Sequence, residues 1–411
     1  MQQVRLVMHL LRWIALGSFV GLLTGTSSAV FLISLKWATT AFVENGWLLY
    51  TLPMTGLLIG LAYHYGGGRS VEGNNLIIDE IHDPKAWVPR RMAPMVFVGT
   101  VATHLSGGSA GREGTAIQMG GSLTDLASRT LRLRPDDRRI MLIAAIAGGF
   151  GSVFGVPLTG AVFALEVQTV GRVRYEALVP ALTASVVGDM IVQALGVHHM
   201  PSSPLASVSL SAELVLKVGL AGIAFGLTSI AFTKSTQWVK QAFAAAISWA
   251  PLRPVIGGLA VIAMTWLVGS RAYNGLSLGL AESSLAGAEV PSWGFALKLV
   301  FTAVTLGSGF VGGEVTPLFV IGATLGATLA GFLGVPVPLL AAIGLVAVFA
   351  GAANTPLACT IMGVELFGSG ALPYFAIACV VSYVFSSHSG LYAAQRVTVS
   401  KIPGRPAPQS E

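Results

Sequence analysis

Charged residues are scarce in this chain of 411 residues, where Asp, Glu, Lys and Arg together make up only 10%. Soluble domains carry about 25% charged residues, so a soluble globular fold is excluded. The chain has only two cysteines, Cys359 and Cys379, which excludes a disulfide framework or a cysteine-based metal cluster. What the chain does have is 54% hydrophobic residues and a mean hydropathy of +0.74, which indicate a polytopic membrane protein.

Long runs without a charged residue give the expected membrane segments. The runs 14–35 and 140–165 are each long enough for one crossing, since about 20 apolar residues span a bilayer. The run 315–364 is too long for one helix, and Pro336 and Pro338 mark the expected break. We interpret the first run as an anchor rather than a cleaved signal. Shorter apolar segments predict further helices at 47–64, 176–197, 214–233, 254–270 and 371–387.

The formal net charge of +6 does not indicate a nucleic-acid partner. The basic residues gather in short loops between apolar runs, as expected for cytoplasmic loops of a membrane protein. The arginine cluster between Arg129 and Arg139 therefore predicts a cytoplasmic loop. We expect a multi-pass protein of the inner (plasma) membrane with both termini in the cytoplasm, without a cofactor or a metal site.

Two landmarks recur in the same order in both halves of the chain. The segment GREGTAIQM at 111–119 matches GGEVTPLFV at 312–320, which places Glu314 opposite Glu113 at an offset of 201. The segment GVPLTGAVFALE at 155–166 matches NTPLACTIMGVE at 354–365 at an offset of 199. Two matches at nearly one offset indicate that the chain is an internal duplication.

The two copies are expected to be inverted in the membrane. The arginine cluster has no charged counterpart in the matching stretch GFLGVPVPLL, so the positive-inside rule places the two stretches on opposite sides. We predict a first inverted repeat over residues 1–200, a second over 201–400, and a short cytoplasmic tail over 401–411. Inverted repeats with broken helices place a substrate near the midplane with helix N-termini directed at an anion, which is the architecture of a transporter.

Glu113 is the main candidate for chemistry. An ionisable group inside a membrane costs roughly 2.5 to 3.5 kcal/mol, so each intramembrane glutamate needs an explanation. Gly111, Gly114 and Thr115 predict a helix start whose free N–H groups bind an anion. The Glu113 carboxylate can bind the same groups when no anion does, so it competes with the ion and carries a proton. The alternative is a structural helix cap paired with Arg112.

Four further residues are candidates for the same site. Glu314 lies just before Thr316 and suits either proton transfer or an ordinary helix start. The amides of Asn74 and Asn75 can cap a helix and donate to an anion at once. Tyr392 offers either an O–H donor or an anchor at the membrane interface.

Glu166 and Glu365 end the second pair of matching segments. Each lies nine residues after a proline, near the C-terminus of a predicted helix. A negative charge at that end of a helix is unfavourable, so we expect a structural role for both and a partner for each carboxylate.

Taken in order, these segments resemble the CLC family of anion channels and anion/proton antiporters over essentially the whole membrane domain. The resemblance rests on GREGT, on GGEVTP where the family commonly has Gly-Gly-x-Phe-x-Pro, on GNNLI where most members have Gly-Ser-Gly-Ile-Pro, and on the tyrosine of SGLYAA. The ordered set is specific, although each segment alone is a weak signal. The resemblance implies an all-α polytopic fold of inverted repeats, with broken helices that meet at the midplane, and a homodimer with one pathway per subunit.

By this resemblance Glu113 is the gating glutamate, which moves into the anion path and carries protons. Asn74 takes the place of the serine that contacts chloride, and Tyr392 matches the coordinating tyrosine. Val315 and Thr316 supply N–H groups to the central site. The anion-binding residues that we expect are Asn74, Asn75, Gly111, Arg112, Gly114, Thr115, Val315, Thr316 and Tyr392.

Three departures from the common pattern resemble the fluoride-exporting branch of the family. Thr115 replaces the usual proline, Asn74 replaces serine, and GEVTP carries Glu314. Chloride exchangers also have an inner proton-relay glutamate one place after the position of Glu166, where this chain has Val167. The resemblance implies that Glu314 transfers protons instead.

The sequence therefore predicts a fluoride/proton antiporter that exports fluoride from the cytoplasm and is not an enzyme. Fluoride is small and strongly hydrated, so amide and backbone donors must replace its water. The inside-negative potential already favours the exit of an anion, and proton entry lowers its internal concentration further. The nearest alternatives are a chloride/proton antiporter and a passive CLC-type channel, which the same fold would support. A more distant alternative is an intramembrane enzyme, which we rank low because we identify neither a His-Glu metal pattern nor a Gly-x-Ser-x-Gly elbow.

Overall fold

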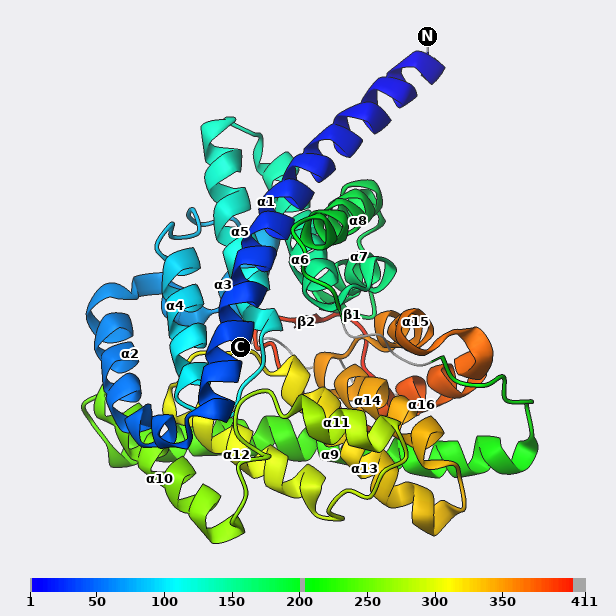
Figure 1. The fold of residues 1–411 in the computed structure, drawn as a ribbon. Coiled ribbons are helices and arrows are strands. Elements are labelled where there is room, and N and C mark those ends of the chain that lie inside the picture. The colour runs from blue at the N-terminus through cyan, green and yellow to red at the C-terminus, as the bar shows by residue number, and fades with distance from the viewer. Residues whose placement is uncertain (1, 200–203, 402–411) are drawn as a thin grey trace.

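The computed structural model of the protein describes residues 2–199 and 204–401, and most of this chain is helical (Figure 1). The α-helices are α1 (Gln2–Glu44), α2 (Leu52–Gly66), α3 (Asn74–His82), α4 (Met92–Leu105), α5 (Glu113–Thr130), α6 (Pro135–Phe154), α7 (Pro157–Glu166), α8 (Leu178–Ala194), α9 (Ala212–Ala246), α10 (Leu252–Val268), α11 (Leu278–Leu285), α12 (Gly294–Ser308), α13 (Val315–Leu333), α14 (Val337–Ala353), α15 (Pro356–Phe367) and α16 (Leu372–Phe385). Four short 3-10 helices, η1 (Gly46–Thr51), η2 (Gly68–Glu72), η3 (Tyr175–Ala177) and η4 (Ser369–Ala371), precede α2, α3, α8 and α16. Two short strands, β1 (Thr169–Val170) and β2 (Arg396–Val397), pair in parallel.

Five helical stretches among the described residues are long and apolar enough to cross a membrane. The predicted anchor 14–35 lies within the first of them, and α1 has 43 residues, which at 1.5 Å per residue is about twice the thickness of a bilayer core. Several shorter apolar helices accompany the five, as broken helices require. The five stretches are Gln3–Glu44, Gly46–Gly66, Tyr175–Ala194, Ala212–Ala246 and Val315–Leu333.

Two predicted segments were wrong in length. The run 140–165 is two helices rather than one crossing, because Gly155 takes a left-handed conformation with φ 71° and ends α6 before Pro157 begins α7. The segment 214–233 continues as α9 to Ala246, beyond Lys234 and Lys240. Long lysine side chains let a helix continue past the apolar region, because the ammonium group reaches water.

The predicted break at Pro336 and Pro338 is confirmed. Gly334, with φ 60°, ends α13, and α14 begins at Val337. A second break follows at Asn354, which has φ 58°, before Pro356 begins α15. The remaining predicted helices correspond to η1 with α2, and to α8, α10 and α16, with ends that differ by up to three residues.

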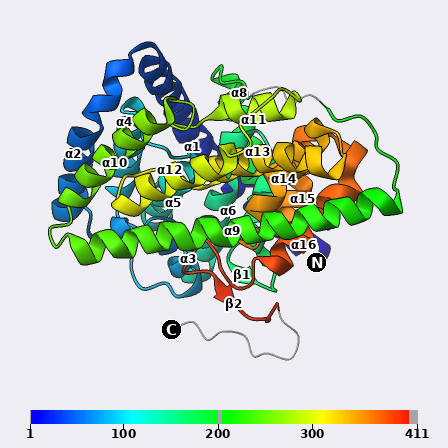
Figure 2. The same cartoon turned by 90° about the horizontal axis from the view of Figure 1, so that it is seen from below.

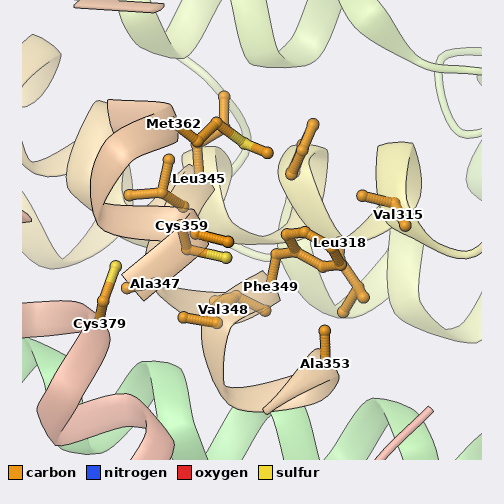
Figure 3. Close-up of a cluster of buried hydrophobic side chains, with 14 of the residues drawn as sticks. Val315, Leu318, Leu345, Ala347, Val348, Phe349, Ala353, Cys359, Met362 and Cys379 are labelled. Atoms are coloured by element: carbon orange, nitrogen blue, oxygen red, sulfur yellow. The ribbon is translucent and has the colours of Figure 1, made fainter. Parts of the chain in front are cut away.

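The largest hydrophobic cluster lies between α6, α7, α13 and α14, next to the candidate site. The rings of Phe150 and Phe163 stack with centroids 4.3 Å apart, and Phe349 lies 6.0 Å from Phe150. Figure 3 shows part of this cluster, with Leu318, Phe349 and Cys359 among the side chains that fill it. Since lipid is as apolar as these side chains, their close packing rather than water exclusion holds the helices together.

Three polar contacts place the described ends of the chain on one side of the molecule. Arg12 of α1 bonds Asp137 of α6 at 2.6 Å, next to the arginine cluster. Arg139 of that cluster donates to the carbonyl of His82 at the end of α3, and Arg396 of β2 pairs with Asp83. Figure 2 shows the N-terminal end, α3 and both strands along the lower edge, and the loop between α1 and α2 at the upper edge.

Candidate functional site

Two loops from opposite halves of the chain meet where α5 and α13 begin. The Gly111 N–H donates to the Gly313 carbonyl at 2.7 Å, and the Gly313 N–H donates back to Gly111 at 2.8 Å. A Cβ atom on Gly111 would lie 2.8 Å from both Glu113 Oε2 and Pro317 Cδ, so only glycine permits this approach. The helix starts predicted at 111–115 and 313–317 are therefore adjacent.

The carboxylate of Glu113 binds the N-terminus of α13. Glu113 is fully buried, and its Oε2 accepts the Thr316 N–H and the Arg112 N–H, both at 3.1 Å. The Thr316 hydroxyl also contacts Oε1. The Arg112 guanidinium lies 3.8 Å from Oε1 and against the Phe154 ring. A carboxylate from one half of the chain thus occupies the free donors of a helix from the other half, where an anion would also bind.

Asn74 and Tyr392 line a very small cavity near Glu113. Its volume is about 10 Å³, close to the minimum that holds one water molecule. Asn74 is the first residue of α3, and a Cβ atom on Gly114 would lie 2.9 Å from its amide nitrogen, so this amide lies against the start of α5. Tyr392 is buried. The other side chains that line the cavity are Ile78, Ile117, Ile146, Phe163 and Val167.

Two of the predicted anion-binding side chains are directed elsewhere. The Asn75 amide oxygen accepts the Ala394 N–H at 3.1 Å, so this side chain holds the C-terminal segment and does not line the cavity. The Thr115 hydroxyl is 2.7 Å from the Thr100 hydroxyl of α4, which leaves only its backbone at the helix start. Sequence spacing placed these residues near the site but did not give the direction of their side chains.

Glu314 faces a cavity that Glu113 does not line. It occupies the N-cap position of α13 without a side-chain cap bond, is partly exposed, and lines a cavity of about 570 Å³. Lys240 near the end of α9 and Arg253 near the start of α10 line the same cavity, together with Tyr63 of α2. The cavity thus joins the Glu314 carboxylate to the exposed Lys240 and the partly exposed Arg253.

Glu166 and Glu365 have the partners that the sequence predicted, and both partners are helix N-termini. The Glu166 carboxylate accepts the N–H groups of Leu357 and Ala358 at the start of α15, at 3.1 and 2.9 Å. The Glu365 carboxylate accepts the N–H groups at the start of α7 at 2.8 and 2.7 Å. Each short helix therefore carries, in its last turn, a glutamate that caps the N-terminus of the other, which offsets the unfavourable charge at both ends.

Sequence reasoning overlooked the segment GGSAG at 107–111, which has the Gly-x-Ser-x-Gly spacing of a hydrolase. Its serine is nevertheless not an exposed nucleophile. Ser109 is fully buried, accepts a bond from the Lys298 ammonium at 2.9 Å and lies 2.9 Å from the Thr302 hydroxyl. Lys298, also fully buried, donates to the Gly275 carbonyl at 2.8 Å. This cluster fixes the approach to α5 rather than performing nucleophilic chemistry.

Sequence reasoning missed the apolar walls of the small cavity and the buried Lys298. The walls come from helices far apart in sequence, so only the tertiary structure brings them together. The sequence did contain a signal for Lys298, since a lysine within an apolar helix indicates a buried, bonded charge. Within residues 2–199 and 204–401 no group of His, Cys, Asp and Glu side chains is arranged to hold a metal ion.

Comparison with known proteins agrees with this architecture. The sequence model of the family described as "Voltage gated chloride channel" matches residues 55–387. A "Chloride/fluoride channel protein" from Pseudomonas syringae pv. tomato is 49% identical over 99% of this chain and 91% of its own length. The crystal structure of a CLC-type fluoride/proton antiporter is 33% identical and superposes with a TM-score of 0.92 over 95% of this chain and 99% of its own. A slow cyanobacterial Cl⁻/H⁺ antiporter, 19% identical, shares the fold with a TM-score of 0.75 over 91% of this chain and 94% of its own. The chain belongs to the CLC family, with the all-α fold of a multi-pass membrane protein.

Proposed function

We propose that this protein is a fluoride/proton antiporter that exports fluoride from the cytoplasm. The observation that carries the proposal is the Glu113 carboxylate bound to the N–H groups of α13, next to a cavity of about 10 Å³ lined by Asn74 and Tyr392. The names of a relative 49% identical to this chain and of a solved structure 33% identical to it both include fluoride, which supports the choice of ion.

The cavity suits a small, strongly hydrated anion. Fluoride is about the size of a water molecule, whereas chloride is larger and must push apart walls formed by Ile117, Phe163 and Val167. The Asn74 amide and the Tyr392 hydroxyl supply donors that replace hydration water. The backbone N–H groups of Arg112, Gly114, Thr115, Val315 and Thr316 at the adjacent helix starts supply the remaining donors. The Gly111 N–H is bonded to the Gly313 carbonyl, so Gly111 contributes the close approach of the two loops.

Glu113 acts as gate and proton carrier in this proposal. When an anion takes the donors of α13, it displaces the Glu113 carboxylate that is bound to them. A protonated Glu113 is displaced at lower cost, because a neutral acid binds N–H donors more weakly than a carboxylate and does not repel the anion. Anion entry and protonation of Glu113 are thereby coupled. This is the physical basis for exchange of fluoride against protons.

Glu314 is proposed to transfer protons between Glu113 and the cavity of about 570 Å³. The chain has Val167 where chloride exchangers have an inner glutamate, so a different carboxylate must serve. Glu314 is the residue that follows Gly313, which is bonded to Gly111 close to Glu113, and it is partly exposed toward that cavity. Its position between the buried glutamate and an open cavity supports the role.

We further propose a homodimer in the inner (plasma) membrane with both termini in the cytoplasm. The contacts of Arg12 and Arg396 place both described ends beside the arginine cluster, which the positive-inside rule assigns to the cytoplasm. The predicted tail 401–411 lies outside the described residues except for Lys401.

Exposed apolar side chains on α7, α8, α15 and α16, such as Leu158, Met190 and Leu357, supply a face for a second copy in the proposed homodimer. The repeats over 1–200 and 201–400 remain a prediction, and their boundary lies outside the described residues.

Flux from liposomes tests the choice of ion. Purified protein is reconstituted into vesicles loaded with equal fluoride and chloride, and both ions are followed with selective electrodes. We expect fluoride to leave faster than chloride. Equal rates would favour the second candidate, a chloride/proton antiporter or passive channel. The name of the 49% identical relative, "Chloride/fluoride channel protein", supports this second candidate too.

A further inference from the structure

The segment after α16 contributes one wall of the small cavity. We call residues 391–401 the C-terminal strap. Its backbone bonds α14 through the Leu391 N–H and the Ala352 carbonyl at 2.9 Å, and it bonds the segment after α7 through the Thr398 N–H and the Val170 carbonyl at 3.2 Å. Tyr392, which lines the cavity, belongs to this strap. The position of the strap therefore sets the position of one cavity wall.

Gln395 ties the strap to the opposite cavity wall. Its amide nitrogen donates to the Val167 carbonyl at 2.7 Å and to the Ala353 carbonyl at 3.0 Å. Its amide oxygen accepts a bond from the Asn354 amide at 2.8 Å. Since Val167 and Tyr392 both line the cavity, this one side chain fixes the distance between two of its walls.

Asn354 joins Gln395 to the end of the strap. It ends α14 in a left-handed conformation with φ 58°, which asparagine tolerates better than most residues. Its oxygen accepts a bond from the Lys401 side chain. That side chain also donates to the Tyr383 carbonyl at 2.8 Å and the Ser386 hydroxyl at 3.0 Å, and lies over the Tyr383 ring. Both polar atoms of the Asn354 side chain are thus bonded to residues of the strap.

We propose that Asn354, Gln395 and Lys401 form a lock that holds the strap against the cavity, and that this lock determines how strongly the cavity discriminates fluoride from chloride. The three are positioning residues, because none of them lines the cavity and all act through Tyr392 and Val167. When the lock opens, the two walls separate and the cavity admits the larger anion. The inference rests on the proposed function, which supplies the ion that the lock helps to select.

Lys401 gives the lock a pH signature. Burial lowers the pKa of Lys401 to about 7. A docked strap therefore holds fewer protons than a released one between about pH 7 and the free lysine pKa of about 10.4. Because the released strap binds the extra proton, docking is weakest below about pH 7 and tightens as the pH rises. The other titratable or charged groups around this end of the strap are Tyr383, His388, Glu166 and Arg172.

The decisive variant is Asn354→Gly. Glycine suits φ 58° at the end of α14, so the fold is retained while both side-chain bonds of the lock are lost. We expect at least a threefold loss of fluoride-over-chloride selectivity in liposomes, with faster hydrogen exchange at the Leu391 and Thr398 amides. The matched control is Arg132→Gly, because Arg132 has φ 51° and lies in an exposed loop. This variant should change neither the selectivity nor the exchange of the two amides.

The outcomes separate the lock from the proposed function. Wild-type selectivity in Asn354→Gly overturns the lock, whether or not the strap exchanges faster. Absence of fluoride transport by the wild type overturns the proposed function, and with it this inference, before any variant is made.

A pair of Lys401 variants supplies an independent readout. In the wild type we expect chloride leak to be about twofold higher at an inner pH of about 6.5 than at about 8.5, following the window given by the Lys401 pKa. Lys401→Met and Lys401→Arg should both remove this dependence, because neither side chain titrates in that range. The arginine variant stays charged at every pH tested, so it should leak like the wild type at low pH. An unchanged pH profile in both variants contradicts the role of Lys401.

Discussion

The two pairs of matching glutamates in this chain have diverged to different degrees. Glu166 and Glu365 make the same contact, since each carboxylate caps the N-terminus of the short helix that carries the other. Glu113 and Glu314 do not, since one is fully buried on the N-terminus of α13 and the other faces an open cavity. Glu166 and Glu365, the outer pair, thus have equivalent contacts, whereas Glu113 and Glu314, the central pair, lie in different surroundings, as the two roles that we propose for them require.

A shift of one residue explains the divergence of the central pair. The bridge sets Gly111 opposite Gly313, so Glu113 is the second residue after the paired glycine and Glu314 the first. Glu113 is consequently the first residue of α5, while Glu314 is the cap of α13. Adjacent positions at a helix start point in different directions, so the two carboxylates reach different surroundings.

Removal of the Glu113 charge should have the largest effect. Glu113→Gln cannot exchange a proton, so we expect proton movement driven by a fluoride gradient to fall to the background of empty vesicles. A pH electrode on vesicle suspensions measures this directly. Proton coupling at the wild-type level would remove Glu113 from the mechanism.

The matched variant Glu314→Gln sharpens the comparison. We expect proton flux to fall at least tenfold while fluoride still crosses, because Glu314 does not contact the donors that bind the anion. Paired fluoride and pH electrodes give the ratio of the two fluxes. If fluoride and proton fluxes stop together, the two glutamates share one role and the asymmetry is wrong.

Asn74→Ser should have a smaller effect on transport. Serine offers one donor where the amide offers two. We therefore expect fluoride-over-chloride selectivity to fall roughly tenfold, which corresponds to the free energy of about one hydrogen bond to a charged group. Competition between the two ions in the electrode assay provides the number. Unaltered selectivity would transfer this role to the backbone donors.

The outer pair should affect stability and leave transport unchanged. Glu166→Gln and Glu365→Gln each weaken two charge-assisted bonds, which costs about 1 to 3 kcal/mol and lowers the thermal midpoint by a few degrees. Because the contacts are symmetric, the two variants should be destabilised by similar amounts in a detergent melt. A loss of proton coupling in only one of them would break the symmetry of this pair.

The sequence predicted those features that depend on local signals. The helix start at Glu113 and the break at Pro336 followed from glycine, proline and the length of apolar runs. The break at Gly155 was missed, because an apolar run alone does not distinguish one buried helix from two. The directions of Asn75 and Thr115, and the cavity at Glu314, depend on contacts between distant segments and carry no local signal.

Simultaneous recording of fluoride and protons tests the central claim most directly. Vesicles that contain the wild-type protein and high internal fluoride are held at zero membrane potential, without an initial pH gradient. The account predicts that fluoride efflux drives protons inward against their own gradient, until the two gradients balance. Fluoride efflux that leaves the internal pH unchanged would identify a passive channel and contradict the role assigned to the Glu113 carboxylate at the start of α13.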